Sequence, residues 1–160
     1  MDNVNGIISE LLALIDQKGQ LFDGIMRMTL EQKKDIEENA AGNIEEFVKR
    51  KQEIIDTIDK IDRIFSEKLV SLKKILNIEA LENADFAKYP LLKELKLKVE
   101  RIMALAGEII VLEESNKEKL ELLMNGLKKE MKHLSVGKKS IRAYESPAIN
   151  NDGIYIDRKK

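Results

Sequence analysis

The stretch that decides the fold is LLKELKLKVERIMALAGEIIVLEESNKEKLELLMNGLKKEMKHL, residues 91–134. Alternating steps of three and four select thirteen residues along it, of which ten are apolar. These residues, called the seam of this helix below, are Leu92, Leu95, Val99, Ile102, Ala106, Ile109, Glu113, Asn116, Leu120, Leu123, Leu127, Glu130 and Leu134. A stripe over about six heptads predicts one long helix that buries one face against other helices. At 1.5 Å per residue it would be about 65 Å long, so we expect at least two further helices beside it.

Two more helices are predicted upstream, over about 4–39 and 44–76, and the third over 91–134. The first has its own seam, in which seven of ten residues are apolar: Val4, Ile8, Leu11, Ile15, Lys18, Phe22, Ile25, Thr29, Gln32 and Ile36. The short turn around Gly42 predicts that the first two helices fold back on each other as a hairpin. Asn77 is expected to end the second helix, and Pro90 suits the first turn of the third.

These patterns predict an all-α fold, an elongated antiparallel bundle or coiled coil of three long helices with a flexible C-terminal tail. The expected domains are a helical bundle over 1–134 and a partner-binding tail over 135–160. The tail lacks helical periodicity but carries Val136, Ile141, Tyr144, Ile149, Ile154, Tyr155 and Ile156. Apolar side chains on an irregular segment suit a region that folds on a partner. Packing of the tail on its own bundle is the alternative.

Composition excludes several classes of protein. The chain has 160 residues, no cysteine and a formal net charge of −1. A disulfide scaffold and a cysteine zinc site are therefore ruled out, and a general nucleic-acid binder is not expected. No signal peptide or 18-residue apolar span is recognisable, so we expect a soluble cytoplasmic protein without membrane insertion.

We find no catalytic constellation, cofactor motif or metal site in the sequence. Glu130 and the sole histidine, His133, have the Glu-x-x-His spacing of di-metal bundles, but such a site needs two copies of the motif. Glu113 and Glu114 are interpreted as charges on a solvated face, and Lys51 as a side chain whose stem covers apolar neighbours while its amine reaches water. Asn116 lies in the seam, where an amide typically fixes helix register.

Three segments resemble FlgN-type flagellar export chaperones. NIEEFVKRKQEII (43–55) is similar to the start of the family's second helix. ESNKEKLELL (114–123) is similar to its Asn-x-x-x-Leu stretch. KKSIRAY (138–144) and the final GIYIDRKK (153–160) resemble C-termini of FlgN-like proteins from Gram-positive bacteria.

This resemblance implies a cytoplasmic chaperone of the flagellar type III export system that is not an enzyme and needs no cofactor. Its expected partners are hook-associated proteins, bound through their C-terminal assembly helices, and the export gate and ATPase complex. Family members bind their export substrates, or clients, through the C-terminal part. On this chain the implied partner-binding residues are Leu127, Met131, Leu134, Ile141, Tyr144, Ile149, Ile154 and Tyr155, with Tyr144 as the candidate contact to the export gate.

Three other interpretations compete with this one. The chain could be a structural coiled coil that self-associates, a chaperone for another flagellar client such as the filament cap protein or flagellin, or a di-metal enzyme. The sequence leaves open whether the chain is a monomer or a homodimer.

Overall fold

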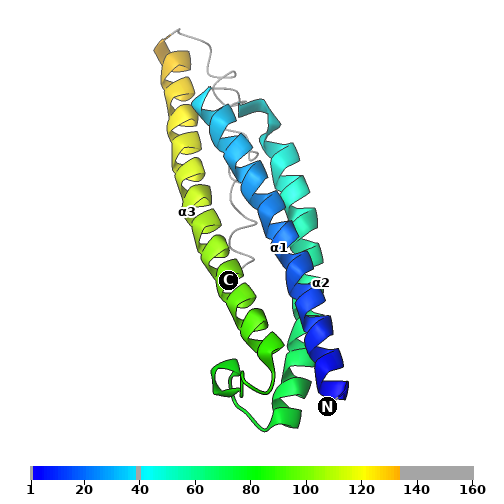
Figure 1. Cartoon of the computed structure of the whole chain (residues 1–160). Coiled ribbons are helices and arrows are strands. Elements are labelled where there is room, and N and C mark those ends of the chain that lie inside the picture. Colours follow the sequence, from blue (N-terminus) through cyan, green and yellow to red (C-terminus); the bar gives the residue numbers. More distant parts are fainter. Residues whose placement is uncertain (1, 39–40, 134–160) are drawn as a thin grey trace. The chain divides into compact units, whose positions relative to one another are not determined.

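The computed structural model describes residues 2–38 and 41–133. Three long helices account for most of them: α1 (Asp2–Glu37), α2 (Ile44–Leu76) and α3 (Pro90–His133), shown in Figure 1. Two short 3-10 turns, η1 (Ala41–Asn43) and η2 (Leu81–Asn83), lie in the connections. The described residues contain no β-strand. The predicted all-α fold with three long helices is confirmed.

The predicted seams of α1 and α3 are buried over most of their length, but the last seam residues of α3 are not: Leu123 is half-buried, and Leu127 and Glu130 are exposed. In α1, nine of the ten seam residues are buried, and the tenth, Lys18, is half-buried and pairs with Asp62 at 2.5 Å. In α3, the seam is buried from Leu92 to Leu120, apart from the half-buried Val99 and Ala106. Covering one large aliphatic side chain contributes about 1.5–3 kcal/mol, so the seam supplies most of the free energy that keeps each helix in place.

The contacts divide the chain into two compact units, and each long helix contributes a segment to both. Unit 1 contains residues 1–26 and 53–108, and unit 2 contains residues 27–52 and 109–160. The prediction that residues 1–134 form a single bundle stays a prediction.

Unit 1 has an entirely apolar core. Its buried side chains are Val4, Ile8, Leu11, Ile15, Phe22, Ile25, Ile55, Ile58, Ile61, Leu72, Leu92, Leu95 and Ile102. Ion pairs at its surface show the helix directions. Glu10 pairs with Lys68 and Lys18 with Asp62, so α1 and α2 are antiparallel here. Asp16 pairs with Lys98 at 2.7 Å, and a Cβ on Gly19 would lie 3.8 Å from Ile102, so α1 and α3 run the same way.

Unit 2 has a mixed core. Its buried apolar side chains are Met28, Ile36, Phe47, Ile109 and Leu120. An equal number of buried side chains are polar or charged: Thr29, Gln32, Lys51, Glu113 and Asn116. Every buried polar side chain of the described residues therefore belongs to unit 2.

A left-handed residue ends α2, as expected from the sequence. Asn77 has φ 55°, the one positive value at a non-glycine position among the described residues. The backbone N–H of Asn77 donates to the carbonyl of Lys74 (3.2 Å), and that of Ile78 donates to the carbonyl of Lys73 (3.0 Å). These two bonds form a Schellman motif, which satisfies carbonyls that the helix itself leaves open.

We expect Asn77→Ala to lower the free energy of unfolding by about 1 kcal/mol, because a Cβ-bearing residue other than asparagine or aspartate is strained in the left-handed region. The free energy of unfolding of Asn77→Gly should equal or exceed that of the wild type. Urea unfolding followed by circular dichroism measures both. Equal stability of the alanine and glycine variants would contradict this account of the helix end.

Candidate functional site

Two of the eight predicted partner-binding residues lie in the described part of the chain, both on α3 in unit 2. The side chain of Leu127 is 41% exposed, and that of Met131 is half-buried. The other six, Leu134, Ile141, Tyr144, Ile149, Ile154 and Tyr155, lie outside the described residues. The assignment of these eight residues to partner binding stays a prediction.

The C-terminal end of α3 continues well past the level of the α1 C-terminus. Lys119 on α3 pairs with Glu37, the last residue of α1, at 3.5 Å. Since α3 ends at His133, fourteen residues follow Lys119. At 1.5 Å per residue they extend about 20 Å further along the helix axis. We call residues 120–133 the α3 end.

The α3 end presents apolar side chains that its own unit covers incompletely. Leu120 is buried, but none of residues 121–133 is. Leu123, Met124 and Met131 are half-buried and Leu127 is exposed, at a spacing that places them on one helix face. The last six residues of α3, KKEMKH (128–133), carry three lysines and one glutamate. The α3 end therefore combines an apolar stripe with several lysines. These features suit binding to an amphipathic helix, which has an apolar face of its own.

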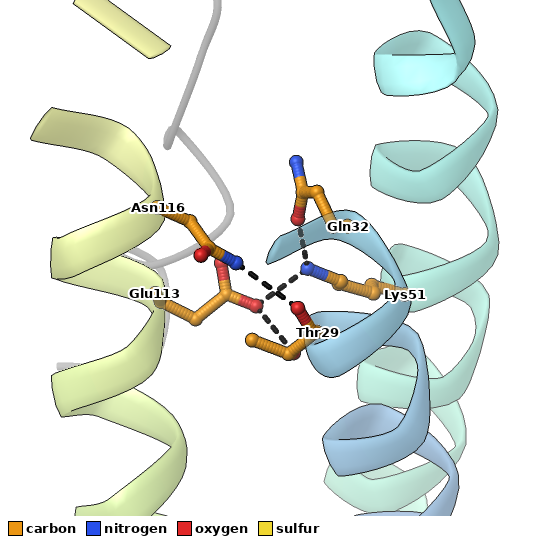
Figure 2. Close-up of polar contacts among 5 residues, drawn as sticks. All are labelled: Thr29, Gln32, Lys51, Glu113 and Asn116. Atoms are coloured by element: carbon orange, nitrogen blue, oxygen red, sulfur yellow. Dashed lines mark hydrogen bonds and ion pairs between the residues drawn. The ribbon is translucent and has the colours of Figure 1, made fainter. Parts of the chain in front are cut away.

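A network of five buried polar side chains lies in unit 2 (Figure 2). Lys51 Nζ donates to Glu113 Oε1 at 2.5 Å and to Gln32 Oε1 at 2.7 Å. The hydroxyl of Thr29 donates to the same Glu113 oxygen at 2.8 Å. Asn116 Nδ2 donates to the backbone carbonyl of Thr29 at 3.0 Å. One carboxylate thus joins side chains from all three helices.

Burial dominates the electrostatics of this network. The side chain of Lys51 is 1% exposed, and its pKa is lowered because removing the ammonium from water disfavours the charged form. The charge of Glu113 and its hydrogen bond act in the opposite direction but do not cancel the effect of burial. A buried ion pair of this kind gains Coulomb energy at a desolvation cost of similar size.

The interpretation of Lys51 and Glu113 as solvated charges is wrong. Both are buried: Glu113 lies in the seam of α3, Lys51 lies one turn from the buried Phe47 and Ile55 of α2, and the two side chains pair with each other. A signal for part of this was present in the sequence. Gln32 and Lys51 are nearly equidistant from the turn at Gly42, so an antiparallel hairpin places them opposite each other. The expected role of Asn116 is compatible with its burial and its bond to α1.

The described residues offer little for chemistry. They contain no group of three or more His, Cys, Asp or Glu side chains that could hold a metal ion. Glu130 and His133 are both exposed. A hollow of about 390 Å³ lies between the end of α1 and the start of α2 in unit 2. Acidic, basic and amide side chains and Phe47 line it, with no cysteine, histidine or hydroxyl group.

Comparison with protein families gives a match to the FlgN protein family over residues 1–151. The chain belongs to the FlgN family. This is a family of flagellar export chaperones rather than of enzymes, so the partner is a protein. Comparisons with curated proteins and with solved structures gave no match. Within the described residues, no helix of this FlgN-family chain is long and apolar enough to cross a membrane.

In this FlgN-family chain, we expect Lys51→Met and Glu113→Leu each to lower the free energy of unfolding by about 3–5 kcal/mol, because each removes one member of a buried ion pair. The double variant should lose less than either single variant, since no buried charge of the pair then remains. Urea unfolding of the four proteins gives the coupling free energy.

The matched control is the surface ion pair Lys18 and Asp62 of unit 1, whose side chains are 22% and 43% exposed. Lys18→Met, Asp62→Leu and their double variant should show a coupling below about 1 kcal/mol. Additive losses at Lys51 and Glu113 would show that the two buried groups do not stabilise each other.

The lowered pKa of Lys51 also predicts a pH dependence. Between this pKa and the usual value of 10.5, the unfolded chain binds more protons at Lys51 than the folded chain, so stability from this residue rises with pH. The stability difference between wild type and Lys51→Met should therefore increase from pH 7 to 10.5. Lys98 is the control, because its hydrogen bond to Asp16 raises its pKa. The difference between wild type and Lys98→Met should stay level to pH 10.5 and shrink above it.

Proposed function

We propose that this chain is a cytoplasmic chaperone of the flagellar type III export system whose clients are hook-associated, or hook–filament junction, proteins. It would hold them before export, prevent their premature assembly and deliver them to the export apparatus. The observation that carries the proposal is the FlgN family match, which spans residues 1–151 of the 160-residue chain. A cytoplasmic location follows from this role, since the chaperone must meet its clients before they are exported.

The α3 end supports a mechanism of client binding. The assembly helices of a client are amphipathic and lack their partners before assembly. The stripe formed by Leu123, Met124, Leu127 and Met131 can cover such a helix, as in helix-in-groove recognition. The predicted tail residues Leu134, Ile141, Tyr144, Ile149, Ile154 and Tyr155 would extend this surface, and Tyr144 would contact the export gate. Ordering a tail on a client costs entropy, so the affinity is moderate and release remains feasible.

We expect Leu127→Asp combined with Met131→Asp to weaken client binding at least tenfold, because two carboxylates would have to be buried against the apolar face of the client helix. Helix content should not change, since neither residue is buried in the chain itself. Titration against purified hook-associated proteins, the filament cap protein and flagellin measures the effect and identifies the client.

Met103→Asp is the matched control, because Met103 is 69% exposed on the unit 1 part of α3. Its client affinity should equal that of the wild type. If Met103→Asp lost as much client affinity as the Leu127→Asp, Met131→Asp double variant, the client would bind at another surface. Sedimentation of the wild type as a stable high-order oligomer that binds none of these clients would instead favour a self-associating coiled coil.

Deletion of residues 135–160 should abolish client binding while leaving helix content and the thermal unfolding midpoint nearly unchanged. The reason is that the seams of α1, α2 and α3 all precede this segment. Circular dichroism and the same titration test it. Loss of helix content in the truncated protein would mean that the tail is part of the core.

A further inference from the structure

The second half of α3 is held by far fewer apolar contacts than the first. In unit 1, α3 buries Leu92, Leu95 and Ile102, and no polar side chain. In unit 2, α3 buries two apolar side chains, Ile109 and Leu120, and between them Glu113 and Asn116. From residue 121 to 133 nothing is buried. Local opening is easiest where buried apolar contacts are few, so the segment 109–133 is the weakest-held part of α3.

The polar contacts that replace apolar ones add little to the net free energy that keeps segment 109–133 in place. The Coulomb energy that Lys51 and Glu113 gain by pairing is offset by the cost of removing both charged groups from water. Asn116 uses its amide N–H toward Thr29, but its buried Oδ1 accepts no hydrogen bond from the described residues. A buried polar atom without a partner favours the state in which it meets water. Opening returns both Glu113 and Asn116 to solvent.

The α1 and α2 parts of unit 2 bury Met28, Ile36 and Phe47 together with Thr29, Gln32 and Lys51. Segment 109–133 contacts the polar part of this surface, through Glu113 to Thr29 and Lys51 and through Asn116 to the carbonyl of Thr29. Withdrawal of Glu113 would leave the ammonium of Lys51 without its buried carboxylate, which makes this surface selective. An incoming helix with only apolar seam residues would bury a charge that it cannot match. A helix with a carboxylate in its apolar seam would restore the pairing.

We propose that unit 2 is a helix-exchange site: segment 109–133 withdraws from α1 and α2, and an amphipathic partner helix that carries an Asp or Glu in its apolar seam takes its place against Lys51. This inference deepens the proposed chaperone function and rests on it for the biological role of the partner. The displaced segment carries the α3 end with it, so that the stripe of the α3 end covers the same partner helix from the side opposite Lys51. It specifies the chemistry by which the chain chooses one amphipathic helix over another, since Glu113 serves as the internal model of the residue that Lys51 recognises.

The opening step is tested by hydrogen exchange of the full-length wild type, read by mass spectrometry. Amides of residues 109–120 should exchange at least tenfold faster than those of residues 92–102 on the same helix. The triple variant Lys51→Met, Glu113→Leu, Asn116→Leu should slow exchange in 109–120, because apolar side chains then replace the polar network. Equal protection of the two segments in the wild type would overturn the proposal.

The recognition step is tested with a peptide of residues 109–133 of this chain, whose seam contains Glu113. The protein is the full-length Glu113→Lys variant, in which two buried ammonium groups would face each other and expel the resident helix. The peptide should bind this variant at least tenfold more tightly than the same peptide with Glu113→Leu. Adding Lys51→Met to the protein should reverse the order, so that the leucine peptide binds better.

Glu114→Lys is the matched control protein, because it makes the same change of charge at the exposed neighbouring position. It should retain the exchange pattern of the wild type and bind neither peptide more than weakly. Equal affinity of the two peptides for Glu113→Lys, or no reversal on adding Lys51→Met, would overturn the proposal. Because these probes derive from the chain itself, their outcome is independent of whether hook-associated proteins prove to be the clients.

Discussion

Burial of one seam on each helix is the constraint on which the rest of the structure depends. Helices of 33 to 44 residues keep their length only if their apolar stripes are covered by other helices. The constraint applies equally to polar residues that occupy seam positions. They are taken into the core with their neighbours, and each needs a polar partner there. Lys51 and Glu113 are buried for this reason, although both are charged.

The two units meet this constraint in different ways. The core of unit 1 is built from aliphatic and aromatic side chains, which pack without directional requirements. In unit 2, half of the buried side chains are polar, and the hydrogen bonds that join them depend on the alignment of α1, α2 and α3. Polar groups at seam positions typically lower stability while they fix helix alignment. Unit 1 therefore supplies stability, and unit 2 supplies selectivity of pairing.

Periodicity was sufficient to predict the helices, the buried face of α1 and that of α3 as far as Leu120. The seam of α1 was predicted residue by residue, including Thr29 and Gln32, because a steric pattern depends only on spacing. The partners of the polar seam residues could not be read in the same way. Glu113 lies 62 positions from Lys51, and pairing at that separation depends on how three helices align, which local patterns do not contain. The residue types led to a wrong interpretation of Lys51 and Glu113 as solvated charges, since lysine and glutamate are seldom buried. The partner-binding residues rest on family resemblance, which placed most of them beyond the described helices.

In the client surface that we propose, Met124 and Met131 have a consequence for the range of proteins that the chain would accept. A thioether side chain is unbranched, rotates about three bonds and is readily polarised, so it adapts its shape to a neighbour at low cost. Leu123 and Leu127 supply apolar area beside it. A surface of this composition adapts to helices of unrelated sequence, so the proposed client surface would accept more than one cargo and would discriminate between them by charge rather than by shape.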